Sequence, residues 1–238
     1  QSIAAIEAAE SICAHVGAIE SAMDLIDYYC RQYKHRNPDE LTIQLLGIRL
    51  FNGSASALKL LLSGYYQTSA LQERDLLETA FLLDLFTADK TLIAAWHSDS
   101  DAARFRPVNV RKSLDDRDGF TEKKRAKAYK LLCELAGHPS GKGFRMLTAV
   151  PGGDACCGPF FDLALLTALL EELAKLMVQA AGAFTRLFSG SSKTDYAVKI
   201  AFMEAQGSWF ERFYGRRFDA TEIENMRALL ARLPNQSI

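Results

Sequence analysis

Residues 63–87 constrain the fold more than any other stretch, because apolar side chains recur there at helical spacing over most of the circumference. One face of the predicted helix carries Ala70, Leu71, Arg74, Leu77, Glu78, Phe81 and Leu85. A second apolar stripe carries Leu76, Ala80 and Leu83. Little of the helix is left for water, so the pattern predicts a mostly buried helix with two charged residues on its buried face.

Arg74 and Glu78 are these two charges, and their spacing of four residues makes them neighbours on one face of the helix. Removing an ion from water costs several kcal/mol unless the ion is paired and hydrogen-bonded. We therefore expect the guanidinium and the carboxylate to be held together, away from solvent, at the centre of a helical bundle.

The composition favours long helices. The 238 residues include only six prolines and 15 glycines, and the hydrophobic and charged fractions of 49% and 24% are ordinary for a globular chain. We predict an all-α fold: a multi-helix bundle with long antiparallel helices in a single domain, 1–238. Its expected parts are an N-terminal long helix over about 2–35, a core bundle over about 38–188 and C-terminal helices over about 194–232.

The chain has features of a cytoplasmic protein. Its five cysteines form no CxxC pair, which indicates free thiols in a reducing compartment and gives no sign of zinc. Acidic residues interrupt the first apolar segment, unlike a signal peptide. The most apolar region, 160–188, contains five charged residues and never reaches the ~18 uncharged residues of a membrane span. We expect no membrane association, and the net charge of −1 provides no overall attraction for nucleic acid.

Two local patterns predict how the helices begin and pack. In the N-terminal helix the apolar positions follow steps of four and three, at Ile12, Val16, Ile19, Met23, Ile26, Cys30 and Tyr33. Such a seam packs against another helix, either within the chain or in a second copy. Asn37 followed by Pro38 and Glu40 predicts the start of the next helix, and Thr221 with Glu224 predicts a capping box for the last one.

Charge is distributed unevenly along the middle of the chain. Residues 104–145 contain twelve Lys and Arg against five acids, a balance of +7. A helix is expected from Thr121, and it should stop at Gly137-His138-Pro139. Its basic residues are candidates for binding an anion or nucleic acid: Lys123, Lys124, Arg125 and Lys127. The alternative is that the preceding acids, Asp115, Asp116 and Asp118, neutralise them.

One constellation is a candidate catalytic site: His138, Arg74, Glu78 and Tyr129. His138 would act as a general acid or base, because an imidazole titrates near neutral pH. Arg74 would bind a phosphate or carboxylate through two hydrogen bonds. The alternative is a structural network, in which the Arg–Glu pair sets the helix register and His138 caps nearby carbonyl groups. The four histidines lack the spacing of metal ligands, so we expect no metal and no cofactor.

Several of these residues belong to a sequence pattern that resembles a known group of proteins. The pattern Ser63-Gly64-Tyr65-Tyr66, then Arg74-Asp75-Leu76-Leu77-Glu78, then Trp96, Tyr129 and His138-Pro139, resembles uncharacterised bacterial helical proteins distantly similar to the HEPN group. The resemblance implies a helical bundle, often dimeric, and in some members a metal-independent ribonuclease of a toxin–antitoxin or phage-defence system. In those ribonucleases an Arg shortly precedes the catalytic His on one helix. Here the corresponding positions are Leu131, Leu132 and Cys133.

The missing arginine favours a non-catalytic, degenerate HEPN-like protein that acts by self-association or by binding a protein partner. The alternative is a HEPN-like ribonuclease or nucleotide-handling enzyme that uses His138 and Arg74, with RNA or a nucleotide as its partner. A third hypothesis is a sensor of small anions built around Arg74.

Overall fold

The computed structural model describes residues 1–150, 152–189, 192–215 and 220–233. Over these ranges the chain is helical without a β-strand, which confirms the all-α class; an isolated β-bridge joins Thr148 and Ala155. The long helices are α2 (Glu10–Arg31), α3 (Pro38–Leu62), α4 (Tyr66–Ala88), α8 (Leu163–Arg186) and α9 (Lys193–Tyr214). The shorter elements are α1 (Ser2–Ala8), α5 (Leu92–His97), α6 (Pro107–Arg117), α7 (Lys124–Leu132), a π-helical turn at Cys133–Gly137, a 3-10 helix at Gly141–Leu147, and α10 (Thr221–Arg232).

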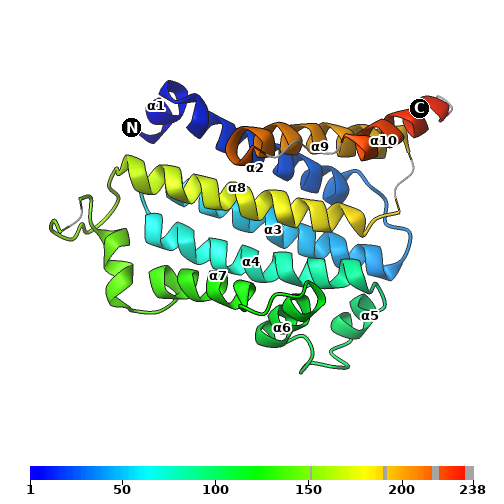
Figure 1. Cartoon of the computed structure of the whole chain (residues 1–238), viewed down its shortest axis with the longest axis horizontal. Helices are drawn as coiled ribbons and strands as arrows, with labels where there is room; N and C mark the ends of the chain where they lie inside the picture. The colour runs from blue at the N-terminus through cyan, green and yellow to red at the C-terminus, as the bar shows by residue number, and fades with distance from the viewer. Residues whose placement is uncertain (151, 190–191, 216–219, 234–238) are drawn as a thin grey trace.

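Helix α8 lies at the centre of the bundle and packs against α2, α3 and α4 (Figure 1). It can do so because apolar side chains cover most of its circumference, and those fully buried include Leu166, Leu170, Leu173, Ala174, Met177, Ala181 and Phe184. Helix α9 covers α2 on one side of the bundle, with α10 against it, and α6 and α7 lie against α4 on the opposite side. The bundle therefore buries one continuous apolar core and leaves two outer layers of helices.

The N-terminal helix is not the single element that was predicted over about 2–35. Ala9 has extended backbone (φ −127°, ψ 105°), and the chain bends by 106° between α1 and α2. After the bend, Ile6 of α1 packs against the core. The predicted seam lies on α2, and Ile12, Ile19 and Ile26 are buried against helices of the same chain. The structure thus shows the intramolecular alternative for the seam.

The predicted helix ends are confirmed in part. The Asn37 side chain accepts a hydrogen bond from the Glu40 amide at 2.9 Å and caps α3. The basic helix ends at Gly137 as predicted, but α7 begins at Lys124, after Lys123 in the left-handed region (φ 51°), and not at Thr121. Helix α10 begins at Thr221 with Ala220 at its N-cap position, so the predicted capping box, which requires Thr221 at the N-cap, is wrong. The capping box occurs instead at the start of α9, between Ser192 and Asp195.

The junction between α3 and α4 fixes where α4 begins. Gly64 has a φ of +82°, and a Cβ at this position would clash with the carbonyl oxygen of Phe160, so only glycine fits. Two residues later, the Tyr66 hydroxyl donates to the Asp162 carbonyl (3.2 Å) and accepts from the Asp162 amide (3.0 Å). These contacts join the N-terminal ends of α4 and α8.

Among the described helices, α3 has the length and hydropathy of a membrane span, and 33% of its most apolar window is buried. The α1–α2 pair passes the same test only when it is counted as one span across the bend. The core helix of a water-soluble bundle meets these criteria too, so the finding is compatible with a soluble protein.

Candidate functional site

Helix α4 is mostly buried, as predicted, and Ala70, Leu77, Phe81 and Leu85 of the predicted face lie in the core, but its charged residues are placed differently. Its fully buried charged residue is Glu73 (0% exposed), whereas Leu71 is exposed and Arg74 and Glu78 are only partly buried. Both α3 and α8 pack on α4, so the buried line runs through Ser69, Glu73, Leu76 and Ala80. The described contacts contain no ion pair or hydrogen bond between Arg74 and Glu78. The prediction that these two residues pair with each other in the core is therefore wrong.

Glu78 pairs instead with Arg111 of α6, a residue that the sequence interpretation missed. Arg111 Nη1 lies 3.7 Å from Glu78 Oε1. The Arg111 guanidinium also lies over the ring of Tyr129, with Cζ 4.0 Å from the ring centroid. The Arg74 guanidinium lies 5.5 Å from the same centroid. Three of the four predicted residues are thus brought together, and two cations contact one aromatic ring, an attractive arrangement.

A sequence signal for Arg111 did exist. Val110 and Leu114 are the two apolar residues of α6 that are buried, and a helix carrying them on its inner face also turns positions 111 and 115 inward. Arg111 and Asp115 are indeed buried, at 9% and 5% exposure.

Tyr129 is held as a neutral phenol. A hydrogen bond with Cys133, burial and the charge of Glu78 raise the pKa of Tyr129 to about 12, although Arg74 acts in the opposite direction. At neutral pH the hydroxyl therefore keeps its proton, which makes Tyr129 a poor general base.

His138 does not join this cluster. Its side chain is exposed, and no described contact links the imidazole to Arg74, Glu78 or Tyr129. Its backbone amide donates to the carbonyl of Cys133 (3.0 Å), closing the π-helical turn. The neighbouring Gly137 does approach the cluster, since a Cβ there would lie 3.0 Å from Arg74 Nη1.

The four basic candidates of the 121–137 region have different surroundings. Arg125 is mostly buried and pairs with Asp115 (3.1 Å), Asp84 (3.5 Å) and Asp118. Lys127 forms an exposed pair with Glu122 (3.5 Å), and Lys124 lies 4.4 Å from the centroid of the Phe120 ring. Lys123 is exposed. Three lysines thus face solvent, while Arg125 is engaged by carboxylates.

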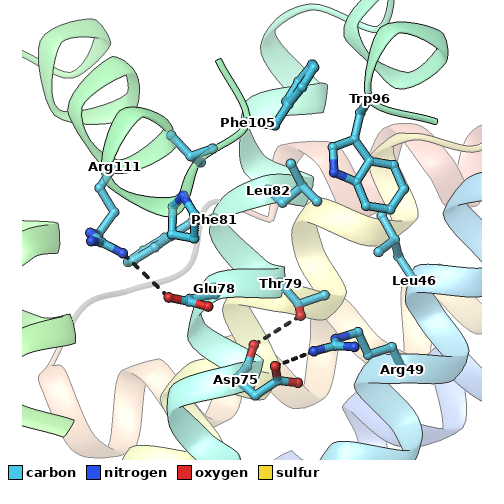
Figure 2. Close-up of a pocket in the computed structure, with 12 residues that line it drawn as sticks. Leu46, Arg49, Asp75, Glu78, Thr79, Phe81, Leu82, Trp96, Phe105 and Arg111 are labelled. Atoms are coloured by element: carbon cyan, nitrogen blue, oxygen red, sulfur yellow. Dashed lines mark hydrogen bonds and ion pairs between the residues drawn. The ribbon is translucent and has the colours of Figure 1, made fainter. Parts of the chain in front are cut away.

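A pocket of about 250 Å³ opens beside the Glu78–Arg111 pair, between α3, α4, α5 and α6 (Figure 2). Its walls are mainly apolar and include Leu46, Phe81, Leu82, Trp96, Phe105 and Val110. Two ion pairs border it: Glu78–Arg111 at one end and the exposed Arg49–Asp75 pair at the other (Figure 2). The pocket therefore offers an aromatic interior with both hydrogen-bond donors and acceptors at its ends.

The Glu78–Arg111 pair retains unused hydrogen-bonding capacity. Its separation of 3.7 Å exceeds a hydrogen bond, and Arg111 Nε and Nη1 are buried with no hydrogen-bond partner. A buried donor without a partner costs about 1–3 kcal/mol, and more when it is charged. Binding of a polar ligand edge beside this pair would let the two side chains complete their hydrogen bonds.

No cluster of three or more His, Cys, Asp or Glu suited to a metal ion occurs within the part of the chain that the structure describes. No protein-family model, no curated protein and no solved structure matches the chain. What the pocket does must therefore be inferred from its own geometry.

Proposed function

We propose that the chain is a non-catalytic binding protein whose ligand occupies the pocket between α3, α4, α5 and α6. The ligand class is a flat heteroaromatic ring whose edge both donates and accepts hydrogen bonds, as a nucleobase does. The proposal rests on the Glu78–Arg111 pair, which lines an aromatic pocket. The two side chains lie too far apart for a hydrogen bond, and Arg111 Nε and Nη1 have no hydrogen-bond partner.

The chemistry of the pocket supports this ligand class. Trp96, Phe105 and Phe81 provide ring faces, and stacking of a base on an aromatic side chain contributes about 1–3 kcal/mol. Glu78 accepts and Arg111 donates, which matches a ring edge carrying both an N–H and a carbonyl or ring nitrogen. The volume of about 250 Å³ lies just below the usual ~300–1,000 Å³ of small-molecule sites, which favours a nucleoside over a larger cofactor.

Titration calorimetry with adenosine, guanosine, cytidine and uridine tests the proposal. We expect at least one nucleoside to bind the unmodified chain. Arg111→Met and Glu78→Gln should each weaken that binding about tenfold or more, because a hydrogen bond to a charged group contributes about 1.5–3 kcal/mol. The matched control is Arg31→Met, which should leave binding unchanged. Arg31 is an exposed residue of α2 that pairs with Asp27 at 2.7 Å. Absence of heat from all four nucleosides at millimolar concentration, or equal binding by Arg111→Met, would contradict the proposal.

The rival function is HEPN-like ribonuclease activity through His138 and Arg74. The exposed His138 and the neutral Tyr129 support the non-catalytic reading. An RNA cleavage assay separates the two functions. Cleavage by the unmodified chain that His138→Ala abolishes would establish the enzyme and overturn the binding proposal.

Self-association is a second candidate function, because α3 carries an apolar stripe that the described chain leaves uncovered. Leu41, Leu45 and Ile48 lie four and three residues apart, so they share a face, and they are 41%, 54% and 43% exposed. An exposed apolar patch of this kind is typical of interaction surfaces. We propose that a second copy of the chain covers this apolar stripe, as the HEPN-like resemblance implies.

Light scattering after size exclusion at about 100 µM tests self-association. We expect a dimer for the unmodified chain and a monomer for Leu45→Glu, since a carboxylate at the interface would lose its hydration. Leu229→Glu, at a leucine of α10 that is 45% exposed, is the matched control and should remain dimeric. A monomeric unmodified chain would remove this candidate.

A further inference from the structure

A second pocket, of about 260 Å³, lies between α8, α9 and α10. Helix α9 packs mainly on α2 and α10, which leaves a groove between α9 and α8. This groove lies on the opposite side of the bundle from α5 and α6 (Figure 1). The two pockets are therefore separate sites, and neither proposal depends on the other.

Lys199 of α9 lines this pocket without a counter-ion. It is partly buried, and the described contacts give its ammonium group no hydrogen bond and no ion pair. The Nζ atom lies 5.7 Å from the centroid of the Tyr29 ring. Burial lowers the pKa of Lys199; Lys90 acts in the same direction, whereas Asp195 and Glu222 act against it. Asp195 is already engaged, because it accepts from the Tyr28 hydroxyl (2.8 Å) and the Ser192 amide (2.8 Å).

A buried hydroxyl lies in the same pocket. Thr185 of α8 is only 9% exposed, and its Oγ1 makes no hydrogen bond of normal geometry, although it is close enough to the Tyr29 hydroxyl to lower the pKa of Tyr29. Arg186 also lines the pocket, and its Nε donates to the Gly182 carbonyl at 3.0 Å. With Lys199 and Arg186 against the single carboxylate of Glu222, the pocket lining carries an excess positive charge of one.

The remaining lining consists of Gly182, Gln206 and three large apolar residues, Phe202, Met203 and Met226. Methionine side chains adapt to the shape of an apolar ligand. An anion with an apolar chain would thus place its charge near Lys199 and Thr185 and its chain against these three residues. Desolvated ions are stable in proteins only when they are paired, and such a ligand would provide the missing counter-ion.

We propose that the groove between α8, α9 and α10 binds a small carboxylate with an apolar chain, with Lys199 and Thr185 at its charged end. Octanoate, 1-octanol and acetate are the probes, each added to the full chain and followed by calorimetry and thermal unfolding. Octanoate should bind and raise the Tm. Octanol lacks the charge and acetate lacks the chain, so both should bind at least tenfold more weakly.

Two variants test the assigned residues. Lys199→Met keeps the apolar stem and removes the charge, so it should weaken octanoate binding at least tenfold. In the ligand-free chain the same change should leave the Tm unchanged or raise it by about 2–4 °C, because a partly buried ammonium group without an ion pair is removed. Thr185→Val should also weaken octanoate binding. Lys59→Met, at an exposed lysine of α3, is the control and should behave as the unmodified chain.

Each of the following results would contradict the proposal. Equal binding of octanoate and octanol would show non-specific apolar association and overturn the proposal. Octanoate binding that Lys199→Met does not weaken would overturn it as well, as would the absence of any octanoate binding at millimolar concentration. A fall in the Tm of ligand-free Lys199→Met would assign Lys199 a structural role and contradict the claim that its charge lacks a partner.

Discussion

Replacing Glu73 by Gln is expected to abolish a pH dependence of stability that the unmodified chain shows between about pH 5 and pH 8. Glu73 is 0% exposed, and neither carboxylate oxygen has a hydrogen-bond partner. Burial raises the pKa of Glu73 to about 8, with a further contribution from Glu172 and an opposing one from Ser69. A lone buried carboxylate is so unfavourable that the group remains protonated at neutral pH.

The sign of this pH dependence follows from the number of protons that the folded and the unfolded chain bind. Below about pH 4, near the ordinary pKa of Glu, both the folded and the unfolded chain are protonated at this position. Between that value and pH 8 the unfolded chain releases the proton while the folded chain keeps it, so the free energy of unfolding falls by about 1.4 kcal/mol per pH unit. Above pH 8 both states are ionised and the contribution is constant.

Urea unfolding of both chains at pH 5, 6.5 and 8, followed by circular dichroism, measures this effect. The difference between the two chains isolates Glu73, because all other titrating groups are shared. Glu73→Gln should become the more stable chain as the pH rises. Glu20→Gln, at an exposed residue of α2, is the control and should retain the slope of the unmodified chain. Equal slopes for Glu73→Gln and the unmodified chain would contradict the expectation.

Replacing Arg125 by Met should destabilise the chain by about 3 kcal/mol, since removing one partner of a buried ion pair leaves the other charge unpaired. Arg125 and its partner Asp115 are both nearly buried, with side-chain exposures of 11% and 7%. Arg125 also pairs with Asp84 of α4 and with Asp118. The guanidinium thus joins α4, α6 and α7. Arg117 pairs with Asp84 (3.0 Å) and Asp118 (2.6 Å) and compensates for part of the loss.

Thermal and urea unfolding of Arg125→Met give the magnitude. Lys127→Met is the matched control on the same helix; its exposed pair with Glu122 should contribute no more than about 1 kcal/mol. The double variant Arg125→Met/Asp115→Asn should recover part of the loss, because it removes the carboxylate left unpaired. A loss for Arg125→Met no larger than that for Lys127→Met would show that the network does not stabilise the fold.

Hydrophobic spacing along the chain is enough to predict the all-α class and most of the helices. The steps of four and three from Ile12 to Tyr33 locate α2, the Asn37-Pro38 start is observed at α3, and Gly137-His138-Pro139 ends the basic helix. These features depend on local properties, namely periodicity, capping and the backbone preferences of glycine and proline. Local signals were insufficient at Ala9, where the bend depends on contacts between α1 and the core.

The candidate site was predictable only in part. Arg74, Glu78 and Tyr129 do come together, but Arg111 supplies the ion pair, and it is 33 positions from Glu78 in the sequence. A pairing over that distance depends on how α6 is placed against α4, which no local pattern specifies. The pocket has the same origin, because its walls come from α3, α4, α5 and α6.

By itself, the sequence determined that this chain forms long helices, and it showed that charged residues accompany the apolar ones on α4. Only the tertiary structure decided which charge is buried, because apolar residues surround α4 so widely that periodicity does not distinguish one stripe from the next. Packing of α3 and α8 selected the stripe through Glu73 and left Arg74 and Glu78 at the edge. Burial depends on what covers a surface, and the covering helices are distant in the sequence.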